Sequence, residues 1–324
     1  MVSQPRKTWQ TINLAFRDCL ENDSTVVLFG EDVASAGGPY GLSRGLLDRF
    51  GTDRVRDTPI SESAIAACAV GAAMCGLRPI VDIMFADFLS LASNQIINQA
   101  AKYSSYFQDE QRLPLVIHSL YGGRASMGPQ HSQSLEAWFC HVPGIDVVTP
   151  GSPQAAYDVL RNAIESDRPT LVLNNVSLLA DSGPFDAELY SANGQLGRMV
   201  QPGEDVTLVT YGTCVKVCQD AVRISGVSAE IIDLTWLSPW DIEMVSTSLH
   251  KTTRLVVVHD AVVAGGWGAE IVAQLTEARL WDLDSPPLRV GAAYAAIPVQ
   301  PRRWREVLPS ADKIADALVK SVGV

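Results

Sequence analysis

Short apolar runs alternate with longer stretches of helical periodicity along the first half of the chain. Runs that are apolar throughout, rather than at every second position, are typical of strands buried on both faces. The helical stretches between them supply the crossover connections that parallel strands need. The pattern predicts strands at residues 25–30, 79–84, 113–118, 145–149 and 170–173, and helices at 8–22, 61–76, 87–103 and 153–165.

Residues 181–204 interrupt this rhythm with turn-forming pairs such as Gly183-Pro184 and Asn193-Gly194. The alternation of strands and helices then starts again, with predicted strands at residues 206–211, 229–234, 255–259 and 288–290. We therefore expect an α/β protein with a parallel-sheet domain at residues 1–190, a linker at 191–204 and a smaller α/β domain at 205–324.

The segment around Glu62 holds one acid at a defined helix end. Pro59 cannot continue a helix, Ser61 is a good N-cap residue, and Glu62 falls in the first turn, where the helix dipole favours a carboxylate. Small residues follow at 63–73 and allow another backbone or a flat ligand to approach closely. An acid in a first turn often serves only to complement the dipole, so catalysis and simple helix capping both remain open here.

A glycine-bearing loop at residues 122–134 follows the strand predicted to end at His118, and a helix is expected to start near Ser132. Ligands of parallel α/β sheets bind beyond the carboxyl ends of the strands. His131 lies in this loop, and an imidazole there can transfer protons near neutral pH. A structural role for His131 is the alternative.

Composition narrows the classes of function. The formal net charge is −11, opposite in sign to what a phosphate-backbone binder needs, so nucleic acid is not an expected partner. Apolar stretches fall short of a membrane span, and the first ten residues lack the apolar core of a signal peptide. The six cysteines form no CxxC pair, so we expect reduced, mostly buried thiols in a cytoplasmic protein.

Taken together, the segments resemble the beta subunit of the thiamine-diphosphate-dependent decarboxylating component of 2-oxoacid dehydrogenase complexes, a transketolase-like family. No dinucleotide fingerprint, P-loop, HExxH or GxSxG motif points elsewhere. The resemblance covers nearly the whole chain. It runs through residues 29–34 (FGEDVA), 57–62 (DTPISE), 76–80 (GLRPI), 85–88 (FADF), 131–134 (HSQS), 205–212 (DVTLVTYG) and 268–271 (GAEI).

The resemblance implies a pyrimidine-binding α/β domain followed by a transketolase C-terminal domain. It implies that Glu62 hydrogen-bonds the aminopyrimidine ring of thiamine diphosphate and so promotes removal of the thiazolium proton. Phe88 matches the aromatic side chain that packs on that ring, and Ile60 would line the same slot. Glu31 matches an acid that supports proton relay, and His131 matches a histidine that reaches the substrate side.

The resemblance also implies partners and ions. This chain has no Gly-Asp-Gly motif for the diphosphate and Mg²⁺, so an alpha subunit is expected to complete the site in an α₂β₂ assembly. A lipoyl acyltransferase or a carrier protein would receive the acyl group. Potassium would be bound through backbone carbonyls at the matching positions Leu115, Ala163, Ser166 and Arg168.

Three departures from the family pattern leave the acyl acceptor open. His118 stands where an arginine is common, Asn174-Asn175 replaces a stretch that usually carries a glutamate and a basic residue, and Tyr294 stands where an acid is usual. The main hypothesis is a 2-oxoacid dehydrogenase beta subunit that acts in decarboxylation and acyl transfer to a lipoyl group. The alternatives are a relative that transfers a two-carbon unit to a carrier protein in specialised metabolism, and a non-catalytic scaffold subunit.

Overall fold

The computed structural model describes residues 4–107, 112–123, 126–190 and 196–323, so part of the predicted linker, 191–195, lies outside the described residues. The chain divides into two compact units. The first comprises Met1–Tyr121 and Trp138–Gly194, and the second comprises Gly122–Ala137 and Gln195–Val324. The loop that carries His131 therefore belongs to the second unit, although it lies between first-unit segments in the sequence.

The first unit is built on parallel strands in the order β6-β7-β5-β4-β2-β3. Every residue of β5 and β7 is buried, so both faces of these strands are covered, as continuous apolar runs predict. A short antiparallel pair joins β1 (Arg6–Lys7) to β8 (Ser182–Gly183). The sheet strands are β2 (Val26–Gly30), β3 (Val55–Asp57), β4 (Arg78–Phe85), β5 (Val116–Tyr121), β6 (Asp146–Val148) and β7 (Thr170–Asn175).

Helices of the first unit pack on this sheet, with α1 against α7 and α3 against β4 and α4. The continuous helix predicted at 87–103 is instead divided, because a π-helical turn at Gln95–Ala100 separates α4 from α5. The predicted helix start near Ser132 is also wrong, since α6 begins at Glu136. The helices are α1 (Thr8–Asn22), α2 (Leu46–Phe50), α3 (Glu62–Met74), α4 (Leu89–Asn94), α5 (Tyr103–Tyr106), α6 (Glu136–Cys140) and α7 (Pro153–Glu165).

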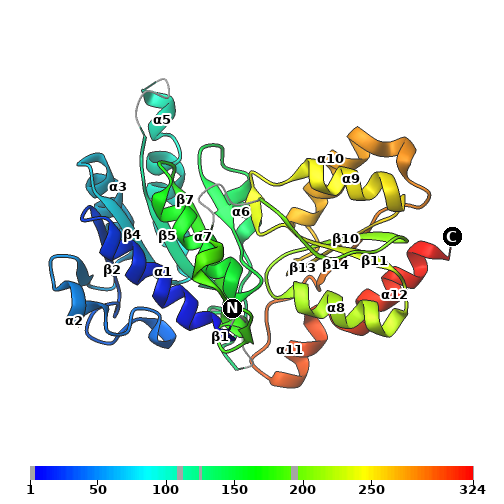
Figure 1. Cartoon of the computed structure of the whole chain (residues 1–324), viewed down its shortest axis with the longest axis horizontal. Coiled ribbons are helices and arrows are strands. Elements are labelled where there is room, and N and C mark those ends of the chain that lie inside the picture. The colour runs from blue at the N-terminus through cyan, green and yellow to red at the C-terminus, as the bar shows by residue number, and fades with distance from the viewer. Residues whose placement is uncertain (1–3, 108–111, 124–125, 191–195, 324) are drawn as a thin grey trace. The chain divides into compact units, whose positions relative to one another are not determined.

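The second unit has a five-stranded sheet in the order β14-β13-β10-β11-β9, parallel except for β9. Figure 1 shows α9 and α10 on one side of this sheet and α8 and α12 on the other. Its elements are β9 (Arg198–Gln201), β10 (Val206–Thr210), α8 (Cys214–Ser225), β11 (Ala229–Asp233), β12 (Trp236–Ser238), α9 (Ile242–Thr252), β13 (Leu255–Val262), α10 (Trp267–Arg279), β14 (Leu288–Ala292), α11 (Pro301–Val307) and α12 (Ala311–Val322).

Four of the six cysteines are buried and all six are free thiols. Burial raises the pKa of Cys19 and of Cys218 to about 12, which keeps both thiols protonated and unreactive. Cys214 and Cys218 pack in the core of the second unit with residues of α12. These cysteines therefore serve packing, as the sequence predicts for most of them.

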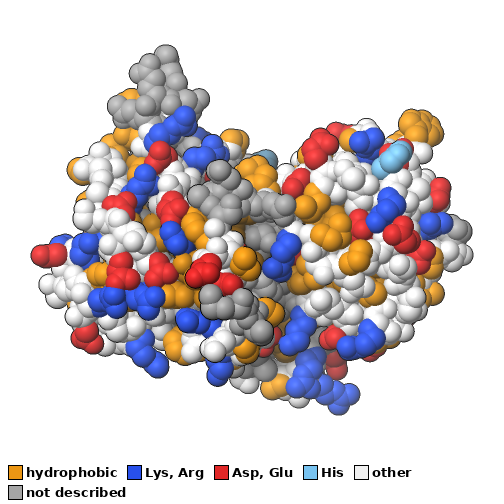
Figure 2. Space-filling model, viewed as in Figure 1, with side chains coloured by type: hydrophobic (Ala, Val, Ile, Leu, Met, Phe, Trp, Pro, Cys, Tyr) orange, Lys and Arg blue, Asp and Glu red, His pale blue; other side chains and the backbone are white. Residues whose placement is uncertain are grey.

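Charges of both signs are interspersed over the face drawn in Figure 2, with basic side chains gathered over α11, where Arg302, Arg303 and Arg305 are exposed. Among the helices described, none combines the length and the apolar character that crossing a bilayer requires.

Candidate active site

Three neighbouring strands of the first unit bring the predicted cofactor residues to one edge of the sheet. β2 pairs in parallel with β3 on one side, where Gly30 lies opposite Asp57, and with β4 on the other, where Gly30 lies opposite Asp82. Glu31 follows β2 directly, Glu62 begins α3 after β3, and Phe88 follows β4. Residues far apart in the sequence thus meet where ligands of parallel sheets bind.

Hydrogen bonds fix the loop that carries Glu31. The Asp57 carboxylate accepts from the backbone N–H of Ala34 at 2.7 Å and from both the N–H and the hydroxyl of Ser35, at 3.1 and 2.6 Å. These donors lower the pKa of Asp57 even though its burial acts in the opposite direction. The N–H of Thr58 donates to the carbonyl of Gly30 at 2.9 Å, which joins the segment before Glu62 to the end of β2.

Glu62 is the first residue of α3 and is partly exposed. Ser61 occupies the N-cap position, as predicted, but its side chain makes no capping hydrogen bond. Burial raises the pKa of Glu31, and the negative charges of Asp32, Glu62 and Asp82 raise it further. Glu31 and Glu62 therefore interact, and the edge gathers carboxylates whose charges repel one another.

Apolar surface accompanies these acids. Ile60, two positions before Glu62, is 72% exposed. Phe88 is half-buried, and its ring makes an edge-to-face contact with Phe85 at a centroid distance of 6.1 Å. A carboxylate acceptor next to exposed apolar surface suits a flat heteroaromatic ring whose amino group can donate a hydrogen bond.

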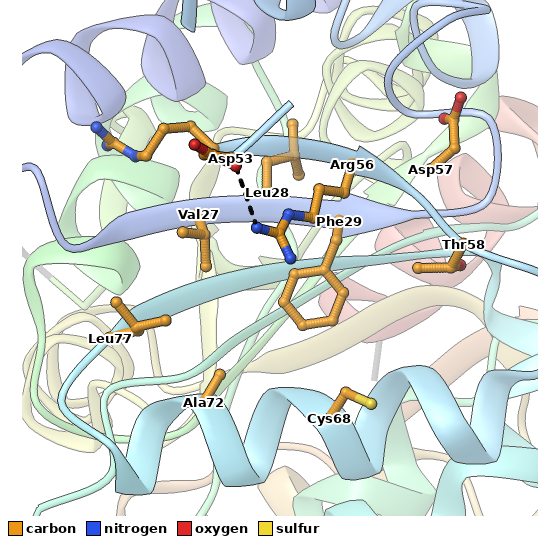
Figure 3. Close-up of a pocket in the computed structure, with 11 residues that line it drawn as sticks. Val27, Leu28, Phe29, Asp53, Arg56, Asp57, Thr58, Cys68, Ala72 and Leu77 are labelled. Atoms are coloured by element: carbon orange, nitrogen blue, oxygen red, sulfur yellow. Dashed lines mark ion pairs between the residues drawn. The ribbon is translucent and has the colours of Figure 1, made fainter. Parts of the chain in front are cut away.

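A separate cavity of about 320 Å³ lies between α3 and the strands β2 and β3 (Figure 3). Phe29, Ala72 and Leu77 give it apolar walls, and Arg56 lies at its rim in an ion pair with Asp53 at 3.6 Å. Glu31, Glu62, Ile60 and Phe88 are not among its lining residues. The predicted cofactor residues thus lie outside this cavity.

Three buried polar side chains lie on the central strands next to this edge, and the sequence pattern does not connect them with one another. His118 Nδ1 lies 2.7 Å from Asp82 Oδ2, and Asn174 Nδ2 lies 3.0 Å from His118 Nε2. All three side chains are almost completely buried. His118 and Asn174 are two of the departures from the family pattern, and their side chains are in contact. Two departures in one sequence are therefore the signal by which this group could be predicted.

His131 is partly buried and lies in the second unit, whereas Glu62 lies in the first. The end of its loop is anchored by Glu136, which is fully buried and accepts a hydrogen bond from the Tyr211 hydroxyl at 2.8 Å. Ser132 and Asp260 line a cavity of about 140 Å³ beside this loop. The role of His131 in a shared site stays a prediction.

Two of the four carbonyls predicted for potassium already accept hydrogen bonds within the chain. Leu115 O accepts from Thr170 N at 2.8 Å, and Ser166 O accepts from Arg78 Nη1 at 2.8 Å. The guanidinium of Arg78 also donates to the carbonyls of Ile164 and Glu165. Each oxygen keeps a second lone pair. Ala163 and Arg168 complete the predicted set, and potassium binding at these four positions stays a prediction.

No group of three or more His, Cys, Asp or Glu side chains that could hold a metal ion occurs in the part of the chain that the structure describes.

Two family models match the chain: the pyrimidine binding domain of transketolase at residues 4–181, and the C-terminal domain of transketolase at residues 196–314. Together they span both units. The first match contains Glu31, Ile60, Glu62 and Phe88.

Full-length relatives agree with these matches. The chain is 36% identical to the 2-oxoisovalerate dehydrogenase subunit beta of Bacillus subtilis, over 95% of each chain. It is 38% identical to the mitochondrial pyruvate dehydrogenase E1 component subunit beta of Caenorhabditis elegans, over 97% of this chain and 91% of the relative. It is 34% identical to the acetoin:2,6-dichlorophenolindophenol oxidoreductase subunit beta of Cupriavidus necator, over 96% of each.

A solved structure supports the fold independently. The chain superposes on a split gene transketolase, described as an inactive beta4 tetramer, with a TM-score of 0.81 over 98% of both chains at 20% sequence identity. At that identity the likeness supports a transketolase-like fold and no more.

Proposed function

We propose that this chain, which belongs to the transketolase-like family of 2-oxoacid dehydrogenase E1 beta subunits, is the beta half of a two-component decarboxylating enzyme. The observation that carries the proposal is the convergence of Glu31, Glu62 and Phe88 at one edge of a parallel sheet. The enzyme would decarboxylate a 2-oxoacid and pass the acyl group to a lipoyl group on an acyltransferase.

The family depends on thiamine diphosphate, and one half of that cofactor fits the residues present. Glu62 would accept a hydrogen bond from the aminopyrimidine ring, and Phe88 and Ile60 would pack on its faces. The other half, a diphosphate with Mg²⁺, needs oxygen ligands that the described residues do not gather into a cluster. We therefore infer that an alpha subunit supplies the diphosphate and Mg²⁺ side, while potassium at the carbonyls named above stays a prediction.

Glu62, Glu31 and His131 would each have a distinct task. When bound, thiamine diphosphate supplies an electron sink for the loss of CO₂ from a 2-oxoacid. Glu62 orients the ring and exchanges a proton with it, since its carboxylate is partly exposed at a fixed helix start. Glu31 would take part in moving that proton, since burial and three neighbouring carboxylates raise its pKa and so strengthen its affinity for a proton. His131 would serve as a proton donor or acceptor on the substrate side.

The exposed face of α3 supports an assembly with other subunits. Ala64, Ala67, Cys68 and Gly71 on this helix are exposed, and the helix carries almost no polar residue after Glu62 and Ser63. A helix that is apolar on all sides is normally buried. Contact with a partner subunit, as in the α₂β₂ assembly that we infer, would bury this face.

Neither alternative function gains support. The proteins to which the chain is similar are named as dehydrogenase or oxidoreductase subunits, and none that we report is named as a carrier-protein transferase. A scaffold subunit would have no use for repelling carboxylates beside exposed apolar surface, because such an arrangement costs stability.

The test is reconstitution with an alpha subunit that carries a Gly-Asp-Gly motif, in the presence of thiamine diphosphate and Mg²⁺. Reduction of 2,6-dichlorophenolindophenol would be followed with pyruvate, 2-oxoisovalerate and acetoin as donors. We expect turnover with at least one donor and none with either subunit alone. Absence of turnover with every donor, in a correctly assembled pair, would contradict the proposal.

A further inference from the structure

The cavity of about 320 Å³ in the first unit arises from the side chains that α3 places over β2. Val27 and Phe29 lie on one face of β2, as the period of two requires, and both are only half-buried while their neighbours along the strand are buried. Over this face α3 presents Cys68 and Ala72, which are one helical turn apart. A thiol and a methyl group are too small to cover the strand, so space remains between the strand and the helix.

The walls of this cavity suit a small apolar body. Figure 3 shows the side chains of Phe29, Ala72 and Leu77 directed into the space between the strands and α3. Its volume lies at the lower end of the range of about 300–1,000 Å³ that is typical of small-molecule sites. A flat body the size of one aromatic ring would remove the exposed surface of Phe29 and Leu77 from water, which favours binding.

Two polar side chains that line the cavity have hydrogen-bonding capacity left over. Arg56 donates from Nε to the carbonyl of Thr52 at 2.9 Å, and its Nη2 lies 3.6 Å from Asp53 Oδ1, which is too far for a hydrogen bond. Its two terminal nitrogens therefore donate no hydrogen bond within the described part of the chain. The hydroxyl oxygen of Thr58 is buried and likewise has no hydrogen-bond partner among the described residues.

The other charged side chains of the cavity determine which ligand charge Arg56 can recognise. Arg54 is already used, because it donates to three backbone carbonyls, and the Asp57 carboxylate accepts three hydrogen bonds from the loop that follows Glu31. One guanidinium with free terminal nitrogens matches one carboxylate, which it can hold through two parallel hydrogen bonds. A dianion such as phosphate would instead be repelled by Asp53 and Asp57 at the same cavity.

We propose that this cavity binds a small monocarboxylate with a flat apolar body. The carboxylate pairs with Arg56, and the apolar body packs between Phe29 and α3. The site is distinct from the predicted cofactor residues, since neither Glu31 nor Glu62 lines the cavity. The inference does not rest on the proposed function, and its test requires no turnover.

The test uses 3-phenylpropionate as the probe and the full-length chain by itself, because Cys68 also belongs to the α3 face that we expect a partner subunit to cover. Cys68 and Cys75 are both exposed, but only Cys68 lines the cavity. Alkylation of each thiol by iodoacetamide would be followed by mass spectrometry of peptides. At ten times its dissociation constant the probe should slow alkylation of Cys68 by about tenfold and leave Cys75, the internal control, unchanged.

Two uncharged or oppositely charged analogues test the class of ligand on the wild-type chain. The amide 3-phenylpropanamide keeps the ring and the shape but lacks the charge, and 3-phenylpropylamine carries the opposite charge. We expect the amide to bind at least about tenfold more weakly than the carboxylate, and the amine more weakly still. Binding of either analogue as tight as that of the carboxylate would overturn the proposal, as would no protection of Cys68 by 3-phenylpropionate at about 10 mM.

Matched variants then locate the ligand. Arg56→Gln should weaken binding of 3-phenylpropionate by about tenfold or more, whereas Arg223→Gln, whose side chain is 76% exposed on α8, should bind as wild type. Ala72→Phe should fill the cavity and abolish protection. Ala67→Phe, exposed on the same helix outside the cavity, should leave protection unchanged. Wild-type affinity in either Arg56→Gln or Ala72→Phe would overturn the proposal, and the wild-type comparison of carboxylate and amide decides it if a variant fails to fold.

Discussion

The carboxyl groups of Glu31 and Glu62, which we call the acid edge of the first unit, lie in a different environment from the buried carboxyl of Glu136 in the second unit. Burial raises the pKa of Glu31 and also that of Glu136. Glu31 adjoins partly exposed Glu62, and their charges oppose one another, whereas Glu136 is fully buried with the Tyr211 hydroxyl as donor. Carboxylates that repel each other at an accessible edge are typical of a catalytic or binding site. A buried carboxyl paired with a hydroxyl is typical of a structural role, here that of anchoring the His131 loop.

The largest effect is expected at the acid edge. Glu62→Gln keeps the shape of the side chain but removes its ability to exchange a proton with the bound ring. We expect turnover of the reconstituted pair to fall by about a thousandfold, with far-ultraviolet circular dichroism and subunit assembly unchanged. Activity within about tenfold of wild type would end the assignment of Glu62.

Lowering the pH should destabilise the second unit through His259, which stacks on Tyr211 at a centroid distance of 6.0 Å. Burial lowers the pKa of His259 from 6.5 to about 4. Between these two pH values His259 is therefore protonated in the unfolded chain and neutral in the folded chain. Its contribution to stability is complete above pH 6.5 and is lost as the pH falls towards 4, by about 3 kcal/mol.

Urea denaturation at several pH values would measure this loss. The wild-type chain should lose more stability than His259→Gln over that window, while His250→Gln, whose side chain is 74% exposed, should behave as wild type. The difference between wild type and variant separates this histidine from carboxyl groups that titrate in the same range. Equal losses in wild type and His259→Gln would show that His259 is protonated in the folded state.

Removing the Tyr211 hydroxyl should destabilise the second unit. Tyr211→Phe leaves buried Glu136 without this donor, and its other oxygen, Oε2, already has no partner among the described residues. We expect a loss of about 1–3 kcal/mol in the free energy of unfolding. Tyr294→Phe is the matched control, since that side chain is 88% exposed, and it should change stability little. A neutral Tyr211→Phe variant would refute the anchoring role.

Two glycine-to-alanine substitutions should change the stability of the chain in opposite directions, because one glycine is closely packed at the acid edge and the other lies on open helix surface. Gly30→Ala places a methyl group 2.5 Å from Asp82 O, so a strand must shift, and we expect a loss of about 1–3 kcal/mol. Gly71 lies on α3 with open space around it, so Gly71→Ala should stabilise the chain by about 0.5–1 kcal/mol. Thermal unfolding of the two variants would measure both changes, and the same sign in both would contradict this packing.

Much of the fold could be predicted from the sequence because its signals are local. Continuous apolar runs identify the parallel strands, and Pro59 and Ser61 correctly place the start of α3. The convergence of Glu31, Glu62 and Phe88 follows from the rule that parallel strands share a carboxyl edge. The identity of the ring that these residues would hold came from the family resemblance and not from the pattern.

The features that were missed depend on contacts between distant segments. The network of Asp82, His118 and Asn174 is set by strand order and register, which hydrophobic periodicity does not reveal. The loop of His131 belongs to the second unit because Glu136 is buried beside Tyr211, a contact that spans 75 positions of sequence. The π-helical turn at Gln95–Ala100 likewise has no counterpart in a pattern that reads as one helix.

Binding of thiamine diphosphate tests most directly the claim that this chain holds only one half of a cofactor site. Isothermal titration calorimetry with cofactor and Mg²⁺ would be carried out on the purified chain alone and on its assembly with an alpha subunit. We predict no binding in the micromolar range by the chain alone and micromolar or tighter binding by the assembly. Micromolar binding by the isolated chain would show that it carries the diphosphate and Mg²⁺ half as well, and would contradict the account.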